Sequence, residues 1–226
     1  PESVTYLGDY AFTRDISLIP EVVRLNIEKR YYLNEFDGFD PLYFENLTIP
    51  ENVRYLGKYA FFGIHLKKLT IADGVSMISN HGFAENHLTS IMIPDSITSI
   101  GIGAFSGNRL TSVRIPNSMT SISNGLFSNN QLAQVIIPNS IKSIGAYAFF
   151  DNQLTSVTIP GSVTEIGISS FKNNQIKSLI IPASVTTIGT SAFENNQLEK
   201  ITILGDIYRF NQEWLEIGFP ENQFPD

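Results

Sequence analysis

The chain has 226 residues, of which 42% are hydrophobic and 16% charged, so it holds enough apolar material for a continuous core and is not expected to be disordered. Its formal net charge of −7 disfavours nucleic acid as a partner, because binding to a phosphate backbone needs a cationic face. The longest apolar runs are too short to cross a bilayer, and the absence of cysteine excludes disulfides and thiolate chemistry.

The sequence opens with a segment that returns later in the chain. Residues 1–12 read PESVTYLGDYAF and align with residues 50–61, which read PENVRYLGKYAF. In the later copy the segment follows a strand-like run. We therefore expect the chain to begin in mid-repeat, after a strand that it does not contain, and an upstream segment to have been removed.

An irregular stretch follows, between Phe12 and Phe39, which is five residues longer than the later repeats. It carries Tyr31, Tyr32 and Phe36. One interpretation is a turn that covers the side of the core, and the other is a projecting aromatic loop that binds a partner. Its carboxylates also make it the region where a glycan-binding or hydrolytic role would have to reside.

From Phe39 onward, one phenylalanine recurs every 22 residues without a slip. The column contains Phe39, Phe61, Phe83, Phe105, Phe127, Phe149, Phe171 and Phe193. Between neighbouring phenylalanines lies a run such as LTSVTIP at residues 154–160, whose apolar positions alternate as in a strand that proline ends. No single unit can bury these faces alone, so the repeats must stack with parallel strands ~4.8 Å apart. We expect a solenoid of about eight turns, roughly 40 Å long.

Two further features recur along the chain. A second apolar pair, such as Ile141 and Ile144, returns the chain to the core before a glycine such as Gly145 permits a turn. Asparagine precedes the strand in six of the units, and we expect these side chains to stack in a column that satisfies backbone groups at the corner. The asparagines are Asn86, Asn108, Asn130, Asn152, Asn174 and Asn196.

The pattern resembles leucine-rich repeat proteins, and within them the bacterial BspA-like class, in which a strand ending in Ile-Pro precedes a Gly-x-x-Ala-Phe segment. The resemblance implies one domain over residues 1–226, an α/β-type repeat solenoid that forms a right-handed superhelix. Short parallel strands would line its concave side, and the convex side would be irregular or extended. Residues 1–39 would form partial, irregular repeats, residues 40–193 regular ones, and residues 194–226 a degenerate repeat with a cap. The chain departs from common leucine-rich repeats in having serine, such as Ser118, where those place asparagine after the strand.

The end of the chain predicts a cap. Asp206 suits a helix N-cap, and Ile207, Phe210, Trp214 and Ile217 follow at helical spacing. A solenoid needs such a cap, because its last turn otherwise exposes apolar side chains and a strand edge.

The sequence offers little catalytic chemistry. The stretch GIGAFSG at residues 101–107 superficially suggests a phosphate loop, but Phe105 belongs to the buried column. His65 and His87 lie one period apart and should be neighbours, yet no third ligand shares their column. We expect no catalytic residues, no metal and no cofactor.

A partner would instead meet the residues that point outward from the strands. This column includes Met92, Arg114, Ile136, Thr158 and Ile180, of which the aliphatic members are not required by the fold. We therefore expect a non-catalytic module that binds a host or bacterial surface protein. By resemblance it would act in adhesion or assembly at a bacterial cell surface or outside the cell. The alternatives are a self-assembling, homo-oligomeric repeat protein and a glycan-binding module.

Overall fold

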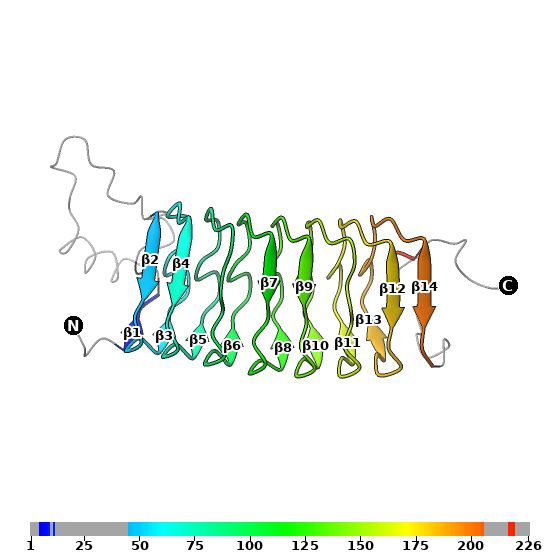
Figure 1. The fold of residues 1–226 in the computed structure, drawn as a ribbon, viewed down its shortest axis with the longest axis horizontal. Helices are drawn as coiled ribbons and strands as arrows, with labels where there is room; N and C mark the ends of the chain where they lie inside the picture. Colours follow the sequence, from blue (N-terminus) through cyan, green and yellow to red (C-terminus); the bar gives the residue numbers. More distant parts are fainter. Residues whose placement is uncertain (1–4, 10, 12–44, 206–216, 220–226) are drawn as a thin grey trace.

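The computed structural model describes residues 5–9, 11, 45–205 and 217–219. These residues form two rows of parallel strands joined by turns, with nearly no helix. The helices that an α/β solenoid would contain are therefore not found in the described residues. Figure 1 shows the turns following one another in a nearly straight row, with the longer strands along one side and the shorter strands along the other. No described segment forms a helix long and apolar enough to span a membrane.

The longer strands carry the predicted apolar alternation and define what we call the long-strand face. They are β2 (Asn46–Ile49), β4 (Lys68–Ile71), β7 (Ser112–Arg114), β9 (Gln134–Ile136), β12 (Ser178–Ile181) and β14 (Lys200–Ile203).

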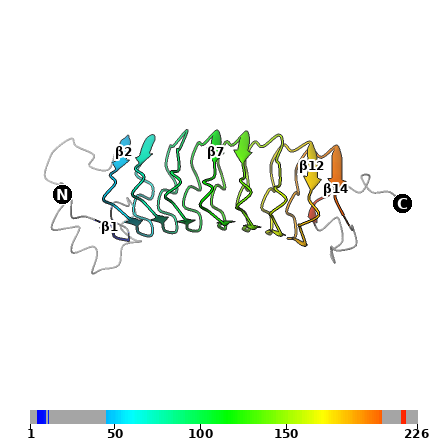
Figure 2. The same cartoon turned by 60° about the horizontal axis from the view of Figure 1, so that its bottom comes forward.

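The shorter strands have two residues each and define the short-strand face (Figure 2). They are β1 (Tyr6–Leu7), β3 (Tyr55–Leu56), β5 (Met77–Ile78), β6 (Ser99–Ile100), β8 (Ser121–Ile122), β10 (Ser143–Ile144), β11 (Glu165–Ile166) and β13 (Thr187–Ile188). They pair in two four-stranded sheets, β1-β3-β5-β6 and β8-β10-β11-β13.

The long-strand face is less continuous than the sequence predicts. Its strands pair as β2 with β4, β7 with β9 and β12 with β14, and residues 90–93 and 156–159 are not part of any of these ladders. Ser156 makes only an isolated bridge with Ser178. Ile93 and Ile159 are nevertheless buried, so the apolar alternation runs on where the hydrogen-bonded ladder is interrupted.

The number of turns also differs from the prediction. β1 pairs directly with β3, which places Leu7 opposite Leu56, 49 residues later, whereas Leu56 pairs with Ile78 at the regular spacing of 22. This turn therefore holds 27 more residues than a regular one, not the five that the spacing of Phe12 and Phe39 suggests. From β2 to β14 seven steps of 22 residues separate eight strand positions, which gives about seven turns over roughly 34 Å in this described stretch, where about eight were expected for the chain.

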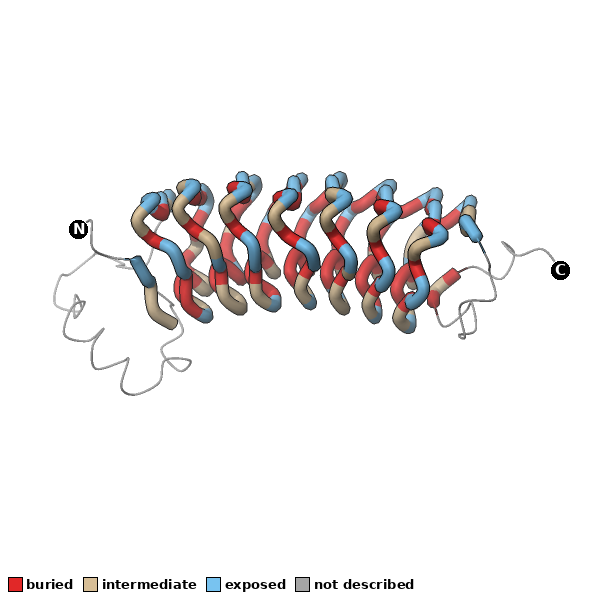
Figure 3. Tube along the Cα trace, turned by 90° about the horizontal axis from the view of Figure 1, so that it is seen from below, coloured by how far each residue is buried: buried red, intermediate tan, exposed pale blue. Residues whose placement is uncertain are grey.

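The core is a stack of aromatic rings surrounded by aliphatic columns. Figure 3 shows how buried stretches of the chain recur from turn to turn. Neighbouring rings from Phe61 to Phe193 lie 5.1 to 5.9 Å apart between centroids, with their planes within 16° of parallel. From Phe83 onward these rings are completely buried. Fully burying one such side chain contributes roughly 1.5 to 3 kcal/mol, so the repeated column is a main source of stability.

The asparagine column links the turns as predicted. Asn130 accepts a hydrogen bond from the backbone N–H of Leu110 (3.0 Å) and donates to the carbonyl oxygens of Phe105 (2.9 Å), Phe127 (3.2 Å) and Ser128 (3.2 Å). The same arrangement recurs from Asn86 to Asn196. One side chain therefore satisfies backbone groups of two successive turns.

The glycine that follows most of the short strands has a different role from the one expected. Gly145, Gly167 and Gly189 do not have a positive φ, but an added Cβ would overlap the backbone of the preceding turn. The left-handed conformation occurs two residues later, where Tyr147 and Ser169 adopt φ values of 58° and 50°. These glycines therefore permit close stacking of the turns, and the turn itself is made by residues that carry side chains.

The described part of the C-terminal region closes the aromatic stack. The ring of Phe219 lies 5.5 Å from that of Phe193, and Phe193 donates a backbone hydrogen bond to Ile217 (3.0 Å). Ile217 and Phe219 are buried, so they cover the last turn. Phe219 was not among the predicted cap residues, and Asp206, Ile207, Phe210 and Trp214 lie outside the described residues.

Candidate binding surface

The predicted contact residues form one column on the long-strand face. Met92, Ile136 and Ile180 are 84%, 65% and 56% exposed, which is high for aliphatic side chains. They recur at every second turn, about 10 Å apart at one ladder spacing per turn. Arg114 and Thr158, also exposed, occupy the turns between them.

Arg114 lies directly beside Ile136, since the two are register partners in β7 and β9. Its guanidinium lies 3.5 Å from the carboxylate of Asp95, and both side chains are more than half exposed. Asp95 also accepts a hydrogen bond from the backbone N–H of Asn117 (3.2 Å). An ion pair this exposed contributes little to stability, so the guanidinium can exchange Asp95 for a partner's carboxylate at small cost.

The surroundings of this column are mostly hydroxyl-bearing at the centre and charged at the ends. Ser112 and Ser156 are exposed beside the central residues, while Lys67 pairs with Glu45 at one end (2.5 Å) and Lys200 lies at the other. Such a surface has aliphatic anchors and a polar rim, which is the usual composition of a protein-binding patch. It has no convergent set of acid, base and nucleophile.

Some of the predicted contact residues lie in hydrogen-bonded ladders and others lie outside them. Arg114 and Ile136 are neighbours in one ladder, and Ile180 lies in β12 opposite Thr202. Met92 and Thr158 lie in the two extended segments that interrupt the ladders. Tyr31, Tyr32 and Phe36, the alternative binding loop, lie outside the described residues.

The histidine pair is adjacent, as its spacing predicts, with ring centroids of His65 and His87 5.0 Å apart. Burial lowers the pKa of His87, and the charges of Arg109, His65 and Lys67 lower this pKa further. The same positive charges would oppose a bound cation. Within the described part of the chain, no group of three or more histidine, cysteine, aspartate or glutamate side chains is placed to hold a metal.

The glycine-rich stretch at residues 101–107 is a turn of the solenoid. Gly103 and Gly107 have φ values of 58° and 64°, and Phe105 between them is buried in the aromatic stack. The phosphate-loop resemblance therefore has no structural counterpart.

The short-strand face carries apolar residues that the sequence analysis did not select. Tyr6, Tyr55 and Met77 occupy one column on three consecutive turns and are all exposed. The signal was present in the sequence as Tyr-Leu-Gly at residues 6–8 and 55–57. It was overlooked because the short strands were treated only as a return to the core.

The chain is similar to solved structures of several bacterial proteins, among them leucine-rich repeat proteins. A leucine-rich repeat protein from Bacteroides ovatus is 27% identical, with a TM-score of 0.52, and the match covers 73% of this chain and 50% of that one. The leucine-rich repeat protein TpLRR of T. pallidum is 22% identical, with a TM-score of 0.52 over 86% of this chain and 72% of that one. The pneumococcal vaccine antigen PcpA is 22% identical, with a TM-score of 0.51 over 72% and 51%.

The chain thus spans about half the length of the Bacteroides ovatus protein and of PcpA. A search of curated proteins finds no match. The sequence profile of the BspA type leucine rich repeat region matches six copies, over residues 35–152 and 98–216. Leucine-rich repeat families are generally non-catalytic binding modules, and the 22-residue columns and stacked parallel turns described above are the structural form of this profile. The chain therefore belongs to the BspA-type leucine-rich repeat family.

Proposed function

We propose that this chain is a non-catalytic protein-binding module that uses the column of Met92, Arg114, Ile136, Thr158 and Ile180 on its long-strand face. The observation that carries the proposal is the exposure of Met92, Ile136 and Ile180, three aliphatic side chains aligned on a face whose other positions are polar. The fold does not need them there, because threonine fills the same column at Thr48, Thr70, Thr158 and Thr202. Covering such side chains with a partner recovers their hydrophobic free energy.

We place this module at a bacterial cell surface or outside the cell, acting in adhesion or assembly. The support is the similarity to PcpA, a vaccine antigen, together with the family of the chain. Self-assembly is the second candidate function, because an aliphatic column can also meet a copy of itself.

The decisive variant is Ile136→Thr combined with Ile180→Thr. Threonine suits an exposed strand position, so the free energy of unfolding should hardly change, whereas binding should weaken by about 1 to 3 kcal/mol if these are anchors. The parent and the double variant are immobilised and exposed to host and bacterial extracts, and the retained proteins are quantified by mass spectrometry. Proteins that the double variant no longer retains are the candidates, and their affinities are then measured with purified material.

Ile137→Thr is the matched control, since Ile137 is buried beside Ile136 and the change should cost stability through lost packing and an unpaired hydroxyl. Sedimentation of the parent tests self-assembly: a concentration-dependent multimer that the double variant abolishes supports it. If the double variant retains the same proteins as the parent and sediments identically, the column is not a binding site.

A further inference from the structure

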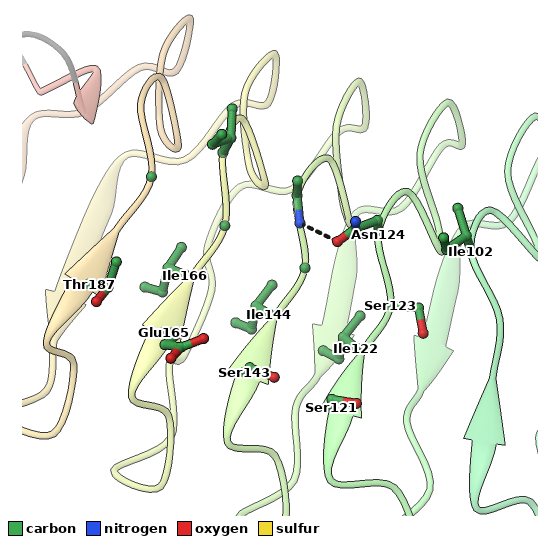
Figure 4. Close-up of a pocket in the computed structure, with 15 residues that line it drawn as sticks. Ile102, Ser121, Ile122, Ser123, Asn124, Ser143, Ile144, Glu165, Ile166 and Thr187 are labelled. Atoms are coloured by element: carbon green, nitrogen blue, oxygen red, sulfur yellow. Dashed lines mark hydrogen bonds between the residues drawn. The ribbon is translucent and has the colours of Figure 1, made fainter.

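A shallow groove of about 550 Å³ crosses the short-strand face, away from the column discussed above (Figure 4). One wall is a rail of polar side chains, Ser121, Ser143, Glu165 and Thr187, which follow one another on β8, β10, β11 and β13. The groove therefore runs across the strands, along the axis of the solenoid.

Ser123 follows β8, but the residue after β10, β11 and β13 is glycine (Gly145, Gly167 and Gly189), so most of the floor of the groove is backbone. The three glycines cannot carry a side chain, because an added Cβ would overlap the backbone of the preceding turn. Their N–H groups already donate to Ile122, Ile144 and Ile166, each at 2.8 Å. A bound chain therefore cannot gain affinity by pairing with N–H groups of the floor, and the walls must recognise it.

The two walls differ in chemistry. Opposite the polar rail, Ile102 and Ile168 stand exposed at positions separated by three turns, with Asn124 and Ala146 between them. Glu165 is the single charged residue that lines the groove. Within the described part of the chain no ion pair neutralises its carboxylate.

The length of the groove suits a short extended peptide. Three ladder steps span about 14 Å, which equals about four residue steps of an extended chain. Consecutive side chains of such a chain point to opposite sides, so a residue facing Glu165 has a neighbour facing Ile168. A saccharide is a poorer fit, because no aromatic ring lines the groove for sugar stacking.

We infer that this groove binds an extended peptide segment of a partner protein, in which a basic residue opposite Glu165 adjoins an aliphatic residue opposite Ile168. A second aliphatic residue four positions away meets Ile102. The negative charge of Glu165 favours the basic residue of the peptide. The separation of Ile102 and Ile168 fixes the spacing of its two aliphatic residues. This site is separate from the long-strand face and does not depend on that proposal.

The test uses the capped pentapeptide Leu-Ser-Ala-Lys-Leu as the probe, with Leu-Ser-Ala-Glu-Leu as its acidic counterpart. The backbone amide signals of Gly145, Gly167 and Gly189 are followed by NMR during titration. We expect the basic peptide to shift these signals at millimolar concentration, and added salt to reduce the effect.

Glu165→Gln should weaken binding of the basic peptide by about threefold to fivefold, the size expected for one exposed charge pair. Ala146→Trp should abolish binding by filling the groove, and the fold should tolerate it because Ile102 and Ile168 occupy the same column.

Glu199→Gln, an exposed carboxylate elsewhere, should leave binding unchanged, as should the Ile136→Thr, Ile180→Thr double variant. Equal binding of the acidic peptide, unmoved glycine signals, or insensitivity to both groove variants would overturn the inference.

Discussion

Individual side chains in this solenoid carry roles that depend on their neighbours one turn away. Asn130 and Ser170 are both polar and buried, yet the first bonds to two turns and the second has no hydrogen-bond partner for its hydroxyl. Burying a polar group is costly unless it is paired. Removing the polar atoms should therefore lower the free energy of unfolding at Asn130 and raise it at Ser170.

Asn130→Ala should destabilise the protein by about 2 to 4 kcal/mol, because it leaves the N–H of Leu110 and the carbonyl of Phe105 buried without this partner. Urea unfolding followed by circular dichroism measures the change. Asn117→Ala, at an exposed position, is the control and should stay within about 0.5 kcal/mol of the parent. A similar small loss at Asn130 would mean that the column is not stabilising.

Ser170→Ala should stabilise the protein by about 1 kcal/mol, since alanine removes a buried hydroxyl that lacks a partner. Ala104, Ala148 and Ala192 already occupy the same column in other turns, so the methyl group fits without rearrangement. The same unfolding experiment applies. A destabilised variant would show that the hydroxyl is paired in solution.

At the scale of the strand and turn, the sequence predicted the register well and the turn chemistry poorly. The 22-residue columns are confirmed, because every paired strand outside the first turn lies one period from its partner. The predicted role of Gly145 was wrong. A glycine in a sequence can indicate either a positive φ or a close approach of another backbone, and only the position of the neighbouring turn distinguishes the two. The pairing of β1 with β3 was also hidden, since Phe39 matches the period by sequence alone. The groove could not be foreseen, because its walls come from five separate turns.

Gly167→Ala and Gly161→Ala test the two kinds of glycine directly. An added Cβ at Gly167 would overlap the backbone of Ala146, so we expect a loss of more than about 2 kcal/mol. An added Cβ at Gly161 meets open space, and Ala183 fills the same column one turn later. Gly161→Ala should therefore be neutral or stabilising by up to about 1 kcal/mol, through the reduced entropy of the unfolded chain. Equal effects in thermal unfolding would contradict the stacking explanation.

For the whole molecule, ionisation makes the fold sensitive to acid. Burial lowers the pKa of His81, and burial with nearby positive charges lowers that of His87, both from 6.5. The hydrogen bond from Lys172 (2.8 Å) lowers the pKa of Glu194 from 4.5, and a hydrogen bond with Ser191 adds to this. In each case the folded chain holds its proton less tightly than the unfolded chain, so acid favours unfolding.

We therefore expect the free energy of unfolding to decline as pH falls below about 6.5, and to decline again below about 4.5. His87→Gln should flatten the first decline, because glutamine already fills this column at Gln131 and Gln153 and does not titrate. Urea unfolding from pH 7.5 to pH 4 provides the measurement. Constant stability across pH 6.5 to 5 in the parent would contradict the assignment.

The fixed register has a further consequence for how such a protein can change length. The asparagine column joins successive turns by the same bonds, since the partners of Asn108, Asn130 and Asn152 are offset identically along the chain. Duplication or deletion of 22 residues inside the regular repeats would therefore preserve these asparagine bonds across any new junction. The separation between Met92 and Ile180 could then change only in increments of one turn, about 4.8 Å. Gene-level duplication would thus adjust the reach of the aliphatic column in discrete steps, without any new contact having to evolve.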